Sequence, residues 1–181
     1  MRFEVHSTLV FTENLNLDFE KMKKEFSFSV DVYDSADLLP EEDALLLAEA
    51  QAATENAYAP YSEFHVGAVA RMSNGKMLSG TNQENASYPI GICAERVLLS
   101  AASSIYPGVP INTIAVTYNN LHGESDHPIA PCGVCRQSLH EYEVRMNQPI
   151  RLILGGKSGK VYVIEQAGQL LPLAFTKDEL V

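Results

Sequence analysis

From residue 40 onward, apolar positions follow first a helical and then a strand period. Residues 40–57 are rich in good helix formers, with a proline at the start and acidic residues in the first turn, so this stretch predicts a helix. Two apolar runs follow at 64–72 and 77–81, and Asn74-Gly75 lies between them. Asn-Gly is a strong signal for a two-residue turn, which predicts an antiparallel hairpin.

The second half of the chain alternates helix and strand again. Helices are predicted at 93–104 and 133–144, and strands at 111–118, 150–155 and 161–165. An order of helix, hairpin, helix, strand, helix and hairpin favours a layered α/β sandwich over a bundle or a barrel. The strands that contain Ala115 and Leu152 should run parallel, because a helix connects them, and the sheet should therefore be mixed.

The N-terminal part of the chain has a weaker pattern. Apolar residues alternate with polar ones over 26–32, which suits a half-buried strand. We divide the chain into an N-terminal extension, residues 1–39, whose structure the pattern does not define, and a main domain, residues 40–181. Met22 is a plausible internal start site, which would make residues 1–21 an appendage.

Charge and composition narrow the range of partners. The 181 residues carry a net charge of −10, and Lys21, Lys23 and Lys24, the one dense group of lysines, stand among acidic residues. Binding a phosphate backbone needs clustered cations, so we expect a small, nearly neutral ligand and no nucleic acid. No apolar run approaches the roughly 20 residues of a membrane helix, and residues 1–10 lack a signal-peptide core. We therefore expect no membrane partner and a cytoplasmic location.

Three cysteines and one glutamate make the sharpest chemical signal. Cys132 and Cys135 have the spacing that suits tetrahedral zinc and start a predicted helix, and Cys93 starts another. Helix N-termini stabilise thiolates, the form that binds metal. Three protein ligands leave one zinc position for water, which is typical of catalytic sites. Glu95 would lie beside the metal as a proton shuttle, and Arg96 could offset the negative charge by donating hydrogen bonds to the sulfurs.

Other interpretations of these residues remain open at this point. A single buried cysteine such as Cys93 is more often part of a core, and a Cys-x-x-Cys pair can be a redox motif. A structural zinc site would need a fourth ligand, for which the histidines are available: His65, His122, His127 and His140. The combination of three thiols with Glu95 favours a catalytic zinc over each of these.

Several motifs give the chain a family resemblance. Cys93-Ala94-Glu95-Arg96, followed by Pro131-Cys132-Gly133-x-Cys135-Arg136-Gln137, resembles the small homotetrameric cytidine deaminases with three cysteine ligands. Further segments resemble that family in the same order: Tyr61-Ser62-x-Phe64-x-Val66-Gly67-Ala68, Asn82-x-Glu84-Asn85-Ala86-x-Tyr88-Pro89 and Leu171-Pro172-x-x-Phe175. The resemblance covers about residues 40 to 180.

The resemblance implies a fold, a reaction and a set of contacts. The fold would be a three-layer α/β/α sandwich with a mixed five-stranded sheet. The reaction would be hydrolysis of free cytidine and deoxycytidine to uridine and deoxyuridine in pyrimidine salvage, with one Zn²⁺ per subunit, attack of zinc-bound hydroxide on C4, and Glu95 moving protons. The implied substrate contacts are ring stacking by Phe64, ribose 3′-hydroxyl bonds from Asn82 and Glu84, and backbone groups near Ala94 and Cys132 that orient the amine.

The same resemblance implies sites shared between the subunits of a homotetramer. Ala86 and Tyr88 would reach a neighbouring subunit's site, and Phe175 would help to close one. Taken alone, Phe64 is more often a core residue, and Asn82 and Glu84 are more often turn residues. Tyr88 could equally be a capped surface aromatic. Rival functions are deamination of another cytosine compound, editing of RNA or DNA, and a zinc-stabilised binding module without turnover.

Overall fold

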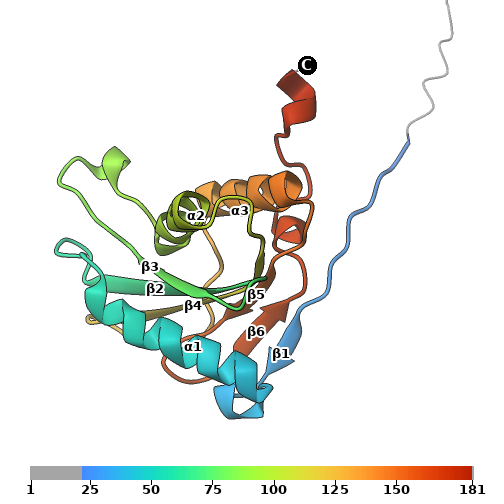
Figure 1. The fold of residues 1–181 in the computed structure, drawn as a ribbon. Helices are drawn as coiled ribbons and strands as arrows, with labels where there is room; N and C mark the ends of the chain where they lie inside the picture. Colours follow the sequence, from blue (N-terminus) through green and yellow to red (C-terminus); the bar gives the residue numbers. More distant parts are fainter. Residues whose placement is uncertain (1–21, 181) are drawn as a thin grey trace, which may run out of the picture.

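A mixed sheet of six strands forms the middle layer of the computed structural model, which describes residues 22–180 (Figure 1). The strand order is β1-β6-β5-β4-β2-β3, and β4 and β5 form the parallel pair of the sheet. The strands are β1 (Asp31–Tyr33), β2 (Phe64–Met72), β3 (Met77–Thr81), β4 (Ile111–Asn120), β5 (Arg151–Leu154) and β6 (Val161–Ile164). The parallel pairing of Ala115 with Ile153 confirms the mixed sheet that the sequence predicts.

Helices cover both faces of this sheet. Helix α1 (Glu41–Ala53) lies on one face, and α2 (Ala94–Ile105) and α3 (Gly133–Met146) lie on the other (Figure 1). Short 3₁₀ turns complete the list: η1 (Ala36–Leu38), η2 (Thr54–Asn56), η3 (Tyr88–Ile90), η4 (Ala167–Leu170) and η5 (Lys177–Leu180). The three-layer α/β/α class is confirmed. No helix among residues 22–180 has the length and apolar character needed to cross a membrane.

The sheet has one strand more than the five predicted. The additional strand is β1, which pairs antiparallel with β6 through Asp31, Val32 and Tyr33. The strand predicted over 26–32 was too long, because only its last two residues pair, and Phe26 and Phe28 are about half exposed. Residues 1–21, which include the proposed appendage, lie outside the described part of the chain.

Strand alternation divides the apolar residues between two cores. Ala68, Val116 and Leu152 pack with α2 and α3, whereas Val69, Ala115 and Ile153 face α1. This period of two is the reason for the continuous apolar runs in the sequence, since both faces of the central strands are buried. The same alternation fixes which side of the sheet Phe64 faces, since this residue begins β2.

Helix α2 packs very closely on β3. A Cβ atom added to Gly80 would lie 2.5 Å from the carbonyl oxygen of Ala94 and 2.6 Å from the amide nitrogen of Leu98. Only glycine leaves room for this approach of helix backbone to strand backbone. The contact sets the height of the first turn of α2 above the sheet.

Candidate metal centre

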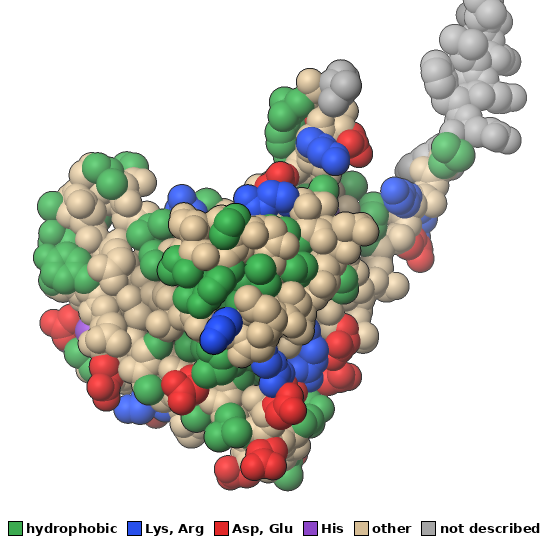
Figure 2. Space-filling view, viewed as in Figure 1, with side chains coloured by type: hydrophobic (Ala, Val, Ile, Leu, Met, Phe, Trp, Pro, Cys, Tyr) green, Lys and Arg blue, Asp and Glu red, His purple; other side chains and the backbone are tan. Residues whose placement is uncertain are grey.

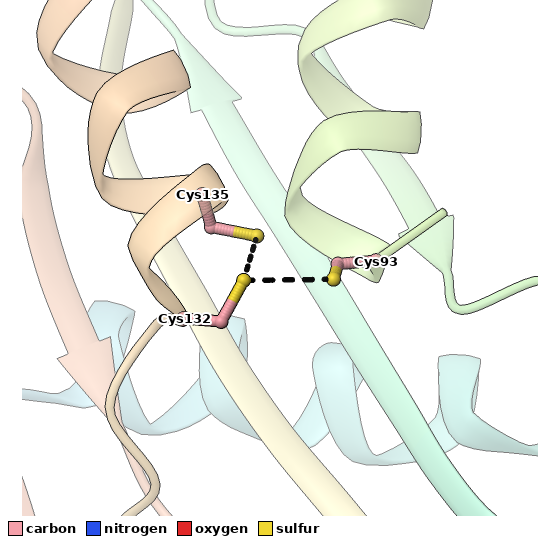
Figure 3. A group of neighbouring side chains, drawn as sticks. All are labelled: Cys93, Cys132 and Cys135. Carbon is pink, nitrogen blue, oxygen red and sulfur yellow. Dashed lines mark hydrogen bonds between the residues drawn. The ribbon is translucent and has the colours of Figure 1, made fainter. Parts of the chain in front are cut away.

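Three cysteines from two helix N-termini converge on one point (Figure 3). Cys93 is the N-cap residue of α2, Cys132 is the N-cap residue of α3, and Cys135 lies in the first turn of α3. The Sγ atoms of Cys93 and Cys132 are 3.8 Å apart, and those of Cys132 and Cys135 are 3.5 Å apart. Neither N-cap side chain accepts a capping hydrogen bond from a backbone amide of its helix, so the sulfurs remain available to a ligand.

These distances fit a tetrahedral zinc ion. A Zn–S bond of about 2.3 Å in tetrahedral geometry separates two sulfurs by about 3.8 Å. All three sulfurs lie within 4.8 Å of one another, and within residues 22–180 no His, Asp or Glu joins the group. The histidines considered as a fourth ligand, His65, His122, His127 and His140, are therefore not in the cluster. Three soft donors, with no fourth ligand in the described part of the chain, match the pattern of a catalytic zinc site.

The electrostatics of the cluster also suit a cation. Hydrogen bonding from Cys135 is the main cause that lowers the pKa of the Cys93 thiol to about 6. The pKa of Cys135 is raised, mainly because of its hydrogen bond with Cys93 and because of burial. Negative charge is thus favoured on one sulfur and opposed on its neighbour. A divalent cation removes this conflict, because it stabilises all the thiolates together.

Glu95 lies in the first turn of α2, next to the cysteines. The residue is 5% exposed, and burial raises the pKa of its carboxyl group. A carboxyl group in this environment holds a proton more readily than a solvated one, which is the property that a general acid and base near neutral pH needs.

Arg96, the residue after Glu95 in α2, is half-buried. Among the hydrogen bonds of the described residues, none joins Arg96 to a sulfur, so the hydrogen bonds predicted from the sequence are not present. Its positive charge nevertheless contributes to the lowered pKa of Cys93.

Phe64 and Asn82 lie at the same end of the sheet as the cysteines. Phe64 begins β2, and its ring stacks on that of Tyr118 with the centroids 4.9 Å apart. The side chain of Asn82 bridges the backbone of β2, since Val66 N donates to its Oδ1 and its Nδ2 donates to Phe64 O, each at 2.8 Å. Asn82 is thus more than a turn residue, because it continues the β2–β3 ladder with its side chain.

Glu84 is held in a fixed orientation. Its Oε2 accepts hydrogen bonds from the amides of Tyr61 and Ser62, and its Oε1 accepts one from Ser62 Oγ at 2.5 Å. Desolvation opposes ionisation, but these three hydrogen bonds together lower the pKa of the Glu84 carboxyl group. Sequence reasoning did not single out Ser62, although its place in the Tyr61-Ser62 motif was a usable signal.

The remaining predicted site residues are less enclosed. Ala86 and Tyr88 lie on the loop between β3 and α2, which projects from the body of the molecule (Figure 1), and Tyr88 is 75% exposed. Figure 2 shows hydrophobic side chains gathered on this projecting loop. Ala94 is fully buried, and Phe175 is exposed on the C-terminal tail, where its carbonyl accepts a hydrogen bond from Gln137.

Known proteins share both the sequence pattern and the fold. Residues 40–147 match the family model described as the cytidine and deoxycytidylate deaminase zinc-binding region. The chain is 36% identical over 136 residues to a cytidine deaminase of Halalkalibacterium halodurans, covering 75% of this chain and 96% of that protein. It is 34% identical over 139 residues to one of Mycobacterium tuberculosis, covering 75% of this chain and 91% of that protein.

A solved structure gives the same result. The crystal structure of cytidine deaminase from Burkholderia pseudomallei is similar with a TM-score of 0.64 and 40% identity, covering 76% of this chain and all of that chain. Three sulfurs at two helix N-termini are spaced for zinc, and the related proteins are matched over most of their length. The chain therefore belongs to the zinc-binding cytidine and deoxycytidylate deaminase family.

Proposed function

We propose that the protein hydrolyses free cytidine and deoxycytidine to uridine and deoxyuridine, with release of ammonia, as an enzyme of pyrimidine salvage. The observation that carries the proposal is the group of three converging thiols beside the buried carboxyl group of Glu95, with no fourth protein ligand among residues 22–180. A purely structural zinc site would be closed by four protein ligands. The cytidine deaminase relatives support the choice of substrate.

Cys93, Cys132 and Cys135 would hold one zinc ion per subunit. When bound, zinc polarises its ligands and lowers the pKa of a bound water from 15.7 toward about 7. The positive ends of α2 and α3 both point at this position and add to the stabilisation of negative charge.

Glu95 would carry the protons of the reaction. Its carboxylate takes a proton from the attacking water and delivers it to ring N3, which makes C4 electrophilic. The oxygen of the water then bonds to C4 as a hydroxyl group. Glu95 takes the remaining proton of this hydroxyl group and passes it to the amino group, so that the C4–N bond breaks, ammonia leaves and C4 becomes a carbonyl. The same group thus acts first as base and then as acid.

The substrate contacts that we propose are those implied by the family resemblance. Phe64 would stack on the pyrimidine ring, and Asn82 and Glu84 would bind the ribose 3′-hydroxyl. The lowered pKa of Glu84 keeps it an acceptor for a hydroxyl group. Asn82 retains one amide hydrogen and one lone pair beyond its two bonds to β2. Backbone groups near Ala94 and Cys132 would orient the amine.

The assembly that we propose is a cytoplasmic homotetramer with active sites shared between subunits. The loop between β3 and α2, which contains Ala86 and Tyr88, projects from the body of the molecule, and the exposed side chain of Tyr88 would be received by a neighbouring subunit. Phe175 would help to close a site in the same way. The net charge of −10 argues against a nucleic-acid substrate.

The decisive test is loss of ultraviolet absorbance with purified, zinc-loaded enzyme. Cytidine and deoxycytidine should be consumed, whereas a cytosine-containing oligonucleotide should not. Glu95→Gln should keep one zinc per subunit and lose turnover by a factor of about 10² or more, because the water loses its proton acceptor. Native enzyme that leaves cytidine unchanged would refute the proposed reaction, and full activity of Glu95→Gln would remove Glu95 from it.

Assembly needs a separate measurement. Specific activity should fall when the protein is diluted below the dissociation constant of the tetramer, in step with the dissociation measured by light scattering. A fully active monomer would contradict shared sites while leaving the reaction intact.

A further inference from the structure

We propose that Tyr118, held in place by His127, is a positioning residue that fixes the ring of Phe64 as the platform for the pyrimidine. This inference rests on the proposed function, in which Phe64 stacks on the substrate. It concerns a pair of residues that the family motifs in this chain do not contain, and it is carried by contacts within the described structure.

Both aromatic rings lie on the side of the sheet that faces α2 and α3. Tyr118 is directly opposite Val66 in the β2–β4 register, and Val66 packs against the core beneath these helices. Because side chains alternate along a strand, Phe64, two residues before Val66, faces the same way. The backbone bonds between Gln83 and Ile92 bring the residue before Cys93 to this end of the sheet.

Tyr118 covers one face of the Phe64 ring. The two rings are nearly parallel, with an angle of 19° between their planes and centroids 4.9 Å apart. Tyr118 is 1% exposed, whereas Phe64 is only half-buried. Because Tyr118 covers one face of the Phe64 ring, only the opposite face can stack on a flat ligand such as a pyrimidine. Pre-ordering the platform avoids the entropy cost of ordering it on binding.

The hydroxyl group of Tyr118 in turn holds the Tyr118 ring in place. It lies 3.2 Å from Nδ1 and 3.4 Å from Nε2 of His127, and Nδ1 is 3.1 Å from Oδ1 of Asp126. One arrangement satisfies all three groups: Nδ1 donates to Asp126, and Nε2 accepts from the Tyr118 hydroxyl. A buried tyrosine hydroxyl needs such a partner, and without it the ring would lose its anchor.

The anchor belongs to the loop that leads into the metal centre. Residues 121–130 connect β4 to Pro131 and Cys132, so His127 is five residues before a zinc ligand. The loop is itself tied down, because Ser125 O accepts hydrogen bonds from the amides of Lys157 and Ser158. The link from Asp126 to Phe64 therefore couples a fixed loop to the stacking platform.

Steady-state kinetics on cytidine, together with the inhibition constant of uridine, test this inference. Tyr118→Phe and His127→Ala each remove the anchor and keep the stacked ring, and each should raise KM and the uridine constant about two- to fivefold. Tyr118→Leu also removes the stacking and should raise both about tenfold, the size of one aromatic pair. In all three variants kcat should stay within about twofold, because the lost interaction is the same for substrate and transition state.

A double variant and a control make the result specific. Tyr118→Phe combined with His127→Ala should be no worse than either change alone, because both break one link. His122→Ala is the control, since this loop histidine pairs with Glu63 and not with Tyr118. It should leave both constants unchanged, with zinc content and Tm measured throughout.

Three outcomes would overturn the inference: native KM and uridine constants in the Tyr118 and His127 variants, an equal effect of His122→Ala, or additive effects in the double variant. With active native enzyme, these results would leave the proposed reaction standing. A native enzyme that does not deaminate cytidine would overturn the reaction and, with it, this role of Tyr118.

Discussion

Gly80→Ala tests whether the close packing of α2 on β3 sets the position of the zinc ligand Cys93. The added methyl group would meet backbone atoms of Ala94 and Leu98, which cannot rotate away as a side chain would. To turn a 2.5 Å approach into an ordinary contact of 3.4 Å, α2 must retreat by about 0.9 Å. Overpacking of this kind costs about 1–3 kcal/mol, which for a chain of this size lowers Tm by about 2–12 °C.

The retreat would also move Cys93, which directly precedes the displaced Ala94. Its sulfur is 3.8 Å from that of Cys132, a spacing that already suits zinc, so a shift approaching 1 Å should weaken zinc binding. A misplacement of about 1 Å can cost a factor of about 10² in catalysis. We therefore expect Gly80→Ala to fold, to retain less zinc after dialysis, and to lose about 10²-fold in kcat/KM on cytidine.

Gly133→Ala is the matched control, because it adds the same methyl group next to the ligand Cys132. That methyl group would meet no atom within 4 Å, and alanine is the better helix former. Zinc retention, Tm and activity should equal or exceed those of the native protein. Native zinc retention and activity in Gly80→Ala, with the control also native, would refute the argument that backbone contact at Gly80 sets the position of Cys93.

Three further predictions concern zinc and stability. Cys132→Ala should abolish zinc binding, measured by elemental analysis, because the ligands bind as a set; full occupancy would contradict the ligand assignment. Asp43→Asn should cost about 2 kcal/mol in denaturant unfolding, because the buried carboxylate accepts from Arg151 at 2.8 Å, and an unchanged midpoint would disprove this contribution. Burial raises the pKa of Glu143, so its contribution to stability is present at low pH and is lost as the pH rises through the folded-state pKa. Glu143→Gln should reduce this fall in stability above about pH 4.5, the unfolded-state value, and a full slope in the variant would exclude Glu143 as a source.

The central elements could be predicted because each has a strong local cause. Strands β2, β4 and β5 are buried on both faces and therefore appear as continuous apolar runs. Asn74-Gly75 marks the turn between β2 and β3, and Gly75 has the positive φ of 79° that such turns need. The helices predicted from Cys93 and from Gly133 begin within one residue of the observed starts at Ala94 and Gly133.

The N-terminal strand could not be placed from its own pattern. Alternation over 26–32 is a local property, whereas pairing needs a partner of sufficient length. Strand β6 has four residues, and β1 pairs with only three of them. Phe26 and Phe28 lie beyond this partner and remain exposed, although their period is that of a strand.

The candidate site was predictable where spacing encodes chemistry and not where distant segments meet. The ligand spacing of Cys132 and Cys135 is visible in the sequence, and the structure brings Cys93 to them. The contact between Tyr118 and His127 depends on the path of a ten-residue loop, for which no local pattern exists. The bonds of Asn82 to β2 likewise appear only when β2 and β3 are paired.

The outer strands of the sheet have a consequence for how copies of the protein can meet. Within residues 22–180, the two edge strands of the sheet are β1, with three residues, and β3, with five. Margins this short offer few free amide and carbonyl groups to an incoming chain, which is a common protection against uncontrolled strand addition and fibril growth. In the homotetramer that we propose, contacts between copies would therefore use helices and loops and not the addition of strands to the edges of the sheet.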